Sequence, residues 1–252
     1  MTSSQIMIPQ PWFVPDWPAP PRVRALCTTR QGGVSAGPYA GFNLAQHVGD
    51  APGNVAANRA LLRTQLPAEP LWLNQVHGTA LAEYRGQSIP PTADAAVARG
   101  ADQVLAIMSA DCLPVLLAGK AGSVVAVAHA GGRGLAAGVI ERAVEAMRVP
   151  PGDVLAWLGP AIGPRAYEVG ADVRQAFAGS DDAQSAHAFA PKADGKYMAD
   201  LYALARQRLT ALGVGSVHGG DACTYSEPGR FYSYRRDGAT GRMASLIWIT
   251  PD

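Results

Sequence analysis

The chain has 252 residues, of which 48% are apolar and 16% charged, and its 21 basic and 20 acidic side chains leave a net charge of +1 at pH 7. This length fits one large domain or two small ones, and the apolar fraction is enough for a sizeable core, which excludes intrinsic disorder. A charge balance this close to zero argues against a nucleic acid or an anionic membrane surface as the partner.

The cysteines and the N-terminus bear on the cellular compartment. Cys27, Cys112 and Cys223 are too few and too scattered for a disulfide framework. No uncharged apolar run reaches the roughly 18 residues that indicate a transmembrane helix. The first residues lack a basic segment followed by an apolar one, so they do not resemble a signal peptide. We therefore expect a cytoplasmic protein with free thiols.

The first hundred residues give weak signals. We expect residues 1–21, which are rich in proline, to form an irregular arm, and residues 83–102 to be rich in turns. Between them the pattern predicts strand Val23–Thr28, a glycine-rich segment 30–50, helix Val55–Leu66 capped by Asn54, and strand Leu71–Val76.

The centre of the chain is easier to interpret. Apolar runs predict strands at 104–108, 113–118, 123–128 and 154–158, with a helix over 135–147 before the last of them. Further on, the pattern predicts helices 172–177 and 198–212, strand 214–218, and a hairpin of strands 231–235 and 242–249. Alternation of strand, glycine loop, helix and strand is typical of an α/β sheet. Without repeats or a clear linker, we expect one domain over residues 1–252.

Three candidate metal ligands lie at the ends of predicted strands. His77 and His129 each stand near glycine, and Cys112 lies in a turn between two apolar runs. A thiolate with two imidazoles suits zinc and leaves a fourth position open for water or substrate. Their long spacings match no zinc-finger pattern. A buried cysteine with two hydrogen-bonded loop histidines is therefore the competing interpretation.

The same residues allow a second chemistry. Cys112 could act as the nucleophile of a cysteine hydrolase, with His129 as its base and Asp111 or another polar group orienting the imidazole. Because metal ligation and nucleophilic attack would use overlapping side chains, the sequence leaves both hypotheses open.

The glycine loop 131–134 precedes a predicted helix and carries Arg133. It fits a dinucleotide-binding pattern, but the next strand ends in Gly159-Pro160 and not in an acidic residue, so a nicotinamide cofactor is not expected. The loop could still bind phosphate or a carboxylate through Arg133 and free backbone N–H groups. A tight strand-to-helix turn that requires glycine explains it as well.

Arginines beside aromatic residues suggest another binding surface. Arg30 follows the first predicted strand, and the segment 231–236 alternates aromatic residues before Arg235 and Arg236. Tyrosine rings and guanidinium groups suit a purine or a sugar with an anionic partner. An edge strand with solvated arginines is the alternative.

Taken together, the motifs resemble the YfiH or laccase-domain family, also called the YlmD family or peptidoglycan editing factor. The segments that carry the resemblance are TTRQGGVS (28–35), FNL (42–44), HVGD (47–50), NQVHG (74–78), ADCLP (110–114), HAGGRG (129–134), GPAIG (159–163), YEVG (167–170) and FYSYRR (231–236). They follow one register over residues 24–249.

The resemblance implies a layered α/β/α fold with a mixed sheet, similar to cysteine hydrolases. It implies a metal site at His77, Cys112 and His129, with zinc as the usual ion and copper as the alternative. It also implies phosphorolysis of adenosine, inosine and methylthioadenosine, with adenosine deamination besides. Older labels of polyphenol oxidase or laccase, and a role in editing peptidoglycan precursors, disagree with this activity.

One residue departs from the family pattern. The family usually has tryptophan where this chain has Gly132. If that tryptophan shapes the loop or packs on substrate, we expect a looser or wider site in this protein, with metal ligation unchanged.

The favoured hypothesis is a metal-dependent purine nucleoside phosphorylase with adenosine deaminase activity. We expect Arg133, helped by Arg30, to bind phosphate, and Arg236 to contact substrate. Asn43, Gln75 and Asp111 are candidates for orienting substrate or relaying protons. The alternatives are a copper-dependent polyphenol oxidase, a cysteine hydrolase acting on a peptidoglycan precursor, and a non-enzymatic binding module. The physiological substrate and the oligomeric state remain open.

Overall fold

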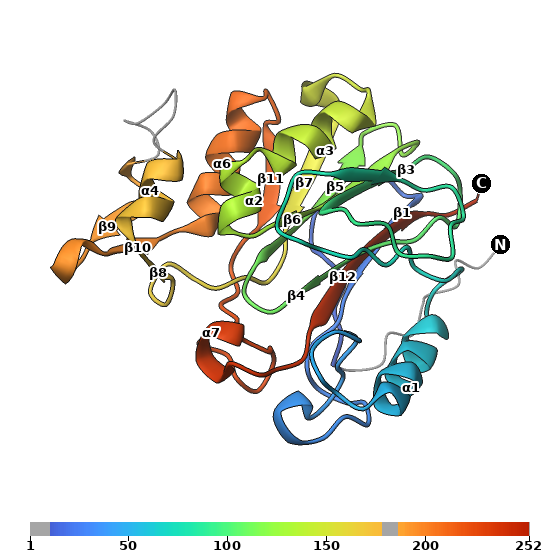
Figure 1. The fold of residues 1–252 in the computed structure, drawn as a ribbon. Helices are drawn as coiled ribbons and strands as arrows, with labels where there is room; N and C mark the ends of the chain where they lie inside the picture. The colour runs from blue at the N-terminus through green and yellow to red at the C-terminus, as the bar shows by residue number, and fades with distance from the viewer. Residues whose placement is uncertain (1–10, 178–185, 252) are drawn as a thin grey trace.

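The computed structural model describes residues 11–177 and 186–251. Its centre is a six-stranded sheet in the order β11-β7-β5-β6-β3-β2 (Figure 1). The strands are β2 (Leu81–Glu83), β3 (Ala95–Ala98), β5 (Leu113–Gly119), β6 (Val125–Ala130), β7 (Val154–Leu158) and β11 (Ser216–Gly219). The pairs β2–β3 and β7–β11 are parallel and the other three antiparallel, so the sheet is mixed.

Both faces of this sheet are buried, because successive side chains of a strand point to opposite faces. In β5, Val115 and Leu117 pack in one apolar cluster, whereas Leu116 packs in another. The first cluster lies under helices α2 (Gly132–Ala136), α3 (Val139–Met147) and α6 (Leu201–Ala211), which cover one face (Figure 1).

A second, antiparallel sheet packs against the other face. It has the order β1-β12-β4, formed by β1 (Val23–Cys27), β12 (Met243–Ile249) and β4 (Leu105–Ser109). Its far side packs in a third apolar cluster that includes Leu62 of helix α1 (Pro52–Arg63). The expected α/β class with a mixed sheet is confirmed, and the second sheet adds a layer between the main sheet and α1.

Smaller elements lie at the edges of this core. Strands β8 (Glu168–Val169), β10 (Tyr197–Ala199) and β9 (Phe189–Pro191) form a small antiparallel sheet beside α4 (Ala171–Phe177). The remaining elements are helix α7 (Tyr234–Asp237) and the 3-10 turns η1 (Gly37–Tyr39), η2 (Pro151–Asp153) and η3 (Ala193–Gly195). Across the two described ranges, no helix is both long and apolar enough to cross a membrane.

The predicted C-terminal hairpin is wrong. The Ser233 side chain accepts a hydrogen bond from the backbone N–H of Arg236 and caps α7, so residues 234–237 are helical. Strand β12 pairs instead with β1 and β4, which are distant in sequence. Arg235 and Arg236 therefore do not alternate along a strand.

Other boundaries differ for local reasons. The predicted helix 135–147 is divided at Gly138, whose φ of 95° lies in the left-handed region. Helix α1 begins at Pro52, a favoured first helical residue, and not after Asn54. The helix predicted from residue 198 begins at Leu201, after Asp200 caps it.

Two expectations for the first hundred residues are also wrong. Residues 71–76 form only isolated bridges through Leu71 and Asn74, so no strand is present there. The segment 83–102, which we expected to be rich in turns and without a strand of its own, contains the fully buried strand β3.

We expect Leu117→Ala to lower the free energy of unfolding by about 2–5 kcal/mol, because Leu117 is fully buried in the main core and its truncation leaves a cavity. Leu61→Ala is the matched control, since Leu61 is 46% exposed and should cost less than about 0.5 kcal/mol. Urea unfolding followed by circular dichroism measures both. Equal losses in the two variants would contradict this description of the core.

Candidate metal centre

Three sequence-distant segments meet at one edge of the main sheet. The turn Ala110–Cys112 connects β4 of the second sheet to β5 of the main sheet. His129 lies near the end of β6, where it is the pairing partner of Pro114 on β5. His77 lies in the loop before β2. The sheet topology therefore brings Cys112 and both histidines together.

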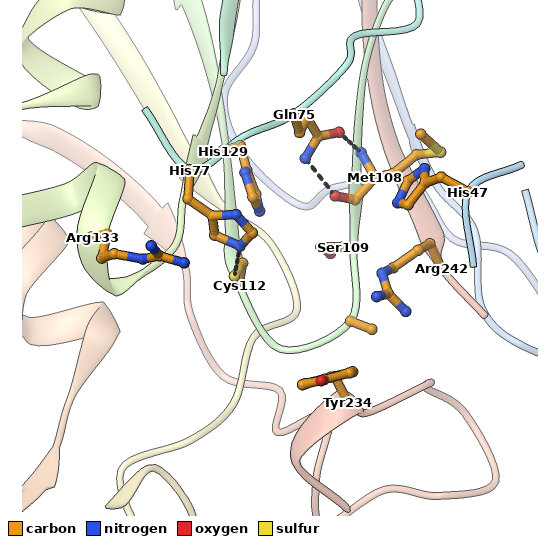
Figure 2. Close-up of a pocket in the computed structure, with 11 residues that line it drawn as sticks. His47, Gln75, His77, Met108, Ser109, Cys112, His129, Arg133, Tyr234 and Arg242 are labelled. Atoms are coloured by element: carbon orange, nitrogen blue, oxygen red, sulfur yellow. Dashed lines mark hydrogen bonds between the residues drawn. The ribbon is translucent and has the colours of Figure 1, made fainter. Parts of the chain in front are cut away.

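The ligand atoms of His77, Cys112 and His129 all lie within 4.8 Å of one another. Cys112 Sγ is 3.7 Å from His77 Nε2, and the two imidazole centroids are 4.8 Å apart (Figure 2). This is the one group of at least three histidine, cysteine, aspartate or glutamate side chains within the described residues that could hold a metal ion.

A fully buried carboxylate, Asp94, supports two of these ligands. Its Oδ1 is 2.8 Å from His129 Nδ1 and accepts the backbone N–H of His77 at 2.9 Å. Its Oδ2 accepts the backbone N–H groups of Val76 and Gly78. Asp94 therefore fixes the His129 ring, with Nε2 left for a metal, and holds the His77 loop, in which His77 has a φ of 61°.

Sequence reasoning missed Asp94. It lies in the segment we expected to be rich in turns. The available signal was a single carboxylate within the apolar run Ala93–Ala98. A charge inside a buried strand requires partners, so this pattern indicates a buried hydrogen-bonding role.

The electrostatics of the centre favour the charged forms of its groups. Burial raises the pKa of the Cys112 thiol, but the charge of His129 and hydrogen bonds from His129 and His77 outweigh it, so the pKa falls to about 6. Burial lowers the pKa of His129, but Cys112 and Asp94 raise it to about 9. Burial also raises the pKa of Asp94, and hydrogen bonds from His129, Gly78 and Val76 lower it overall.

These residues fit a metal ion. A thiolate and two imidazoles are preferred zinc ligands, and an imidazole oriented by a carboxylate is the usual supporting arrangement. Three protein ligands leave one coordination position for water or substrate. Gly131 belongs to the same packing, because a Cβ at this position would lie 2.7 Å from Cys112 Sγ.

The same geometry also resembles a catalytic triad. Cys112, His129 and Asp94 have the order of nucleophile, base and orienting carboxylate. Asp94, and not the predicted Asp111, occupies the orienting position. The structure therefore keeps both chemistries open, with one difference: His77 is needed as a ligand but has no role in a triad.

Asp111 supports the turn that carries Cys112. Its carboxylate accepts hydrogen bonds from Thr224 Oγ1 and from the backbone N–H of Arg235, both at 2.6 Å. Its φ of 98° is rare for a residue with a side chain, and these two bonds hold that conformation. Asp111 thus positions Cys112 and does not line the pocket.

The candidate metal ligands line a cavity of about 430 Å³ (Figure 2). Arg133 extends toward Cys112 from one side, and His47, Tyr234 and Arg242 lie on the opposite side. Gln75 also lines the cavity, as predicted, but its amide exchanges two hydrogen bonds with the backbone of Met108 and so fastens the 74–78 loop to β4.

Three predicted substrate-binding residues lie outside the cavity lining. Arg30 donates to the carbonyl of Pro228 and stacks over the Tyr232 ring. Arg236 donates to backbone carbonyls and pairs with Asp237. Both arginines thus hold loops by donating to backbone carbonyls of irregular segments.

Asn43, the third of these residues, is fully buried. Its Oδ1 accepts the backbone N–H of Arg242, and its Nδ2 donates to Asp50. It therefore positions the pocket residue Arg242 and does not itself reach the cavity.

Sequence reasoning did not assign His47 or Arg242 to the site, and it included Tyr234 only as one of the aromatic residues of segment 231–236. Loss of solvent around the ring lowers the pKa of His47, and the charges of Arg242 and Arg59 lower it further, so the imidazole is neutral at neutral pH. Arg242 Nη1 donates to the carbonyls of Thr240 and Gly241, and its guanidinium stacks on Tyr234. The sequence features that could have indicated these two residues are the HVGD segment, which begins with His47, and the glycine that precedes Arg242.

The position of Gly132 is not open space. A Cβ at this residue would lie 2.5 Å from the hydroxyl oxygen of Tyr167. The expected widening beside Gly132 is therefore offset by a tyrosine side chain that reaches this point from the segment before β8.

Known proteins match this chain over nearly its whole length. A family model described as multi-copper polyphenol oxidoreductase laccase matches residues 24–250. A purine nucleoside phosphorylase of Pseudomonas aeruginosa is 52% identical over 239 residues, covering 94% of this chain and 98% of the relative. Purine nucleoside phosphorylase YfiH of Escherichia coli is 52% identical over 240 residues, with the same coverage.

A solved structure agrees with the fold. A crystal structure of a Neisseria meningitidis protein has a TM-score of 0.92 and 50% identity, and the match covers 95% of this chain and 99% of that one. The chain therefore belongs to the family described as multi-copper polyphenol oxidoreductase laccase, the laccase-domain family that its motifs resemble.

Proposed function

We propose that this protein is a metal-dependent purine nucleoside phosphorylase that accepts adenosine, inosine and methylthioadenosine and also deaminates adenosine. Relatives that are 52% identical over 94% of the chain carry the name purine nucleoside phosphorylase. The observation that carries the proposal is the convergence of His77, Cys112 and His129 in one cavity with two arginines.

Phosphorolysis requires two substrates side by side. A phosphate oxygen forms a bond to C1′ of the ribose, the N-glycosidic bond breaks, and the purine leaves with the electron pair and gains a proton. The products are ribose 1-phosphate and the free base. A cavity of about 430 Å³ with a cationic group on each side suits this pair.

The two arginines differ in how they are engaged. Arg133 has no hydrogen bond or ion pair at its guanidinium within the described part of the chain, and it faces Cys112 (Figure 2). Arg242 already donates to two carbonyls. This supports Arg133 as the phosphate ligand, with the nucleoside between the metal centre and Tyr234.

The neutral imidazole of His47 lies on the nucleoside side of the cavity. A neutral imidazole both donates and accepts a hydrogen bond. His47 could therefore orient the purine and exchange a proton with it. Tyr234, whose side chain is largely exposed, offers a ring face on which a base can stack.

Zinc is the metal we propose, with copper as the alternative, and when bound it would supply a Lewis acid at one end of the cavity. His77, Cys112 and His129 would hold it, with Asp94 fixing the His129 ring. A set of two histidines and one cysteine also occurs at copper sites, so the residues alone do not choose the ion.

A cysteine hydrolase is the second candidate function. The Cys112–His129–Asp94 order favours it, as does the low pKa of about 6 for Cys112. It does not use His77, which is why we rank it below the metal-dependent reaction.

Cys112→Ser should lower phosphorolysis at least about 100-fold, because it removes the thiolate from the metal centre. Cys223→Ser is the matched control, since Cys223 does not line the cavity, and should retain activity. Chromatography of adenosine incubated with protein and phosphate would follow adenine, ribose 1-phosphate and inosine. Products that form equally without phosphate would refute phosphorolysis.

Asp94→Asn should weaken zinc affinity about 10- to 100-fold, because the amide no longer accepts the His129 N–H and the three backbone donors equally well. Competition with a chromophoric chelator measures the affinity. Asp221→Asn, which changes an exposed carboxylate, is the control. Unchanged affinity in Asp94→Asn would contradict the assigned role.

Removal of the metal separates the two candidate functions. We expect the chelator-treated protein to be inactive and to recover with zinc. In that metal-free protein, alkylation of Cys112 should become faster as pH rises through about 6, because the thiolate is the reactive form, and zinc should protect it. Full activity of metal-free protein, lost on alkylation, would favour the hydrolase instead.

A further inference from the structure

Tyr167 places a hydroxyl group at the glycine loop of the metal centre. Its oxygen lies so close to Gly132 that a Cβ there would be 2.5 Å away. The preceding residue, Gly131, is packed just as closely on Cys112 Sγ. Two consecutive glycines therefore separate Tyr167 from Cys112, and the residue that follows them is Arg133.

The hydroxyl of Tyr167 has no hydrogen-bond partner among the residues that the structure describes, 11–177 and 186–251. In the same ranges, the buried side-chain polar atoms that lack a hydrogen-bond partner are Glu141 Oε2 and Thr240 Oγ1. The Tyr167 oxygen also lacks a partner but is not one of these buried atoms, so solvent reaches it. Tyr167 is not among the residues that line the cavity, but its hydroxyl lies against Gly132, the residue before the cavity-lining Arg133. An accessible donor without a partner at this point is available to a ligand that Arg133 binds.

The ring of Tyr167, by contrast, is held in place. The guanidinium of Arg235 lies 5.3 Å from the ring centroid and donates to the carbonyl of Glu168. The backbone N–H of Arg235 donates to Asp111, next to Cys112. The ring is thus tied to the turn that carries Cys112, and the hydroxyl direction is fixed relative to the metal centre.

The charge around this hydroxyl makes it a donor. Burial raises the pKa of Tyr167, and the neighbouring Cys112 raises it further, so the phenol is protonated at neutral pH. The guanidinium of Arg133 donates hydrogen bonds and cannot accept them. Two donor groups flank the loop, and both suit the oxygens of a tetrahedral anion.

We propose that Tyr167 is a phosphate-positioning residue, whose hydroxyl donates a hydrogen bond to the anion that Arg133 binds beside the metal centre. This inference rests on the proposed phosphorolysis and names the residue that orients its second substrate. Gly132 leaves the space that this hydroxyl occupies, because a Cβ at this position would displace the hydroxyl.

The test uses zinc-loaded full-length protein and three variants: Tyr167→Phe, Gly132→Ala and the double variant. Gly132 is helical with an ordinary φ, so alanine is compatible with the backbone, and its Cβ would meet the hydroxyl end of Tyr167. Tyr225→Phe and Gly53→Ala are matched controls, since the Tyr225 side chain is exposed and a Cβ at Gly53 meets nothing within 4 Å.

We expect Tyr167→Phe to raise the KM for inorganic phosphate at least about 10-fold, the typical effect of losing a hydrogen bond to a charged group, with the KM for inosine unchanged. Gly132→Ala should act in the same direction. The double variant should match Tyr167→Phe within about 2-fold, because the two changes remove one interaction. Tyr167→Phe should keep the wild-type Tm, since the hydroxyl bonds no other residue in the described part of the chain.

The outcomes separate this inference from the proposed function. Wild-type turnover with an unchanged phosphate KM in Tyr167→Phe, or a raised KM for inosine alone, would overturn the role of Tyr167. Additive effects of the two substitutions would overturn the role of Gly132. Absence of phosphorolysis in wild type would end the proposed function; the rise in Tm with inorganic phosphate, lost in Tyr167→Phe, would still support the anion site.

Discussion

The buried carboxylate of Asp94 is the interaction on which the candidate site depends. It binds the ring of His129 and the backbone N–H groups on either side of His77, so one side chain holds residues from β6 and from the loop before β2. A buried charge is costly unless it is paired and fully hydrogen-bonded. Asp94 meets that condition only when both histidine segments are in place, so the centre forms as a unit.

Sequence reasoning found the candidate metal ligands because each stands at a strand end beside glycine or within a turn, where α/β sheets gather functional residues. It could not find Asp94, since the four partners of that carboxylate lie 16–35 residues away in the chain. It also proposed Arg30 and Arg236 as substrate-binding residues, although neither of them lines the cavity. The sequence shows that these side chains are charged, but it does not show which backbone carbonyls accept their hydrogen bonds.

The fold shows the same division between local and distant information. Apolar runs correctly predicted β1, β4, β5, β6 and β7, because these largely buried strands contain few residues that are not apolar. The C-terminal hairpin failed because residues 234–237, expected at the end of its first strand and in its turn, form helix α7. The partners of β12 are β1 and β4. The residues of a strand do not by themselves determine whether it pairs with a segment close in sequence or with a distant one.

The turn Ala110–Cys112 joins the two sheets, so Cys112 belongs to the junction between them, whereas His129 belongs to the main sheet alone. An ion bound to both would therefore act as a cross-link between the layers. By thermodynamic linkage, whatever tightens the packing of one sheet on the other tightens ion binding, and ion binding stabilises the interface in return. Substitutions in the apolar core between the sheets should consequently tune the metal centre without touching it.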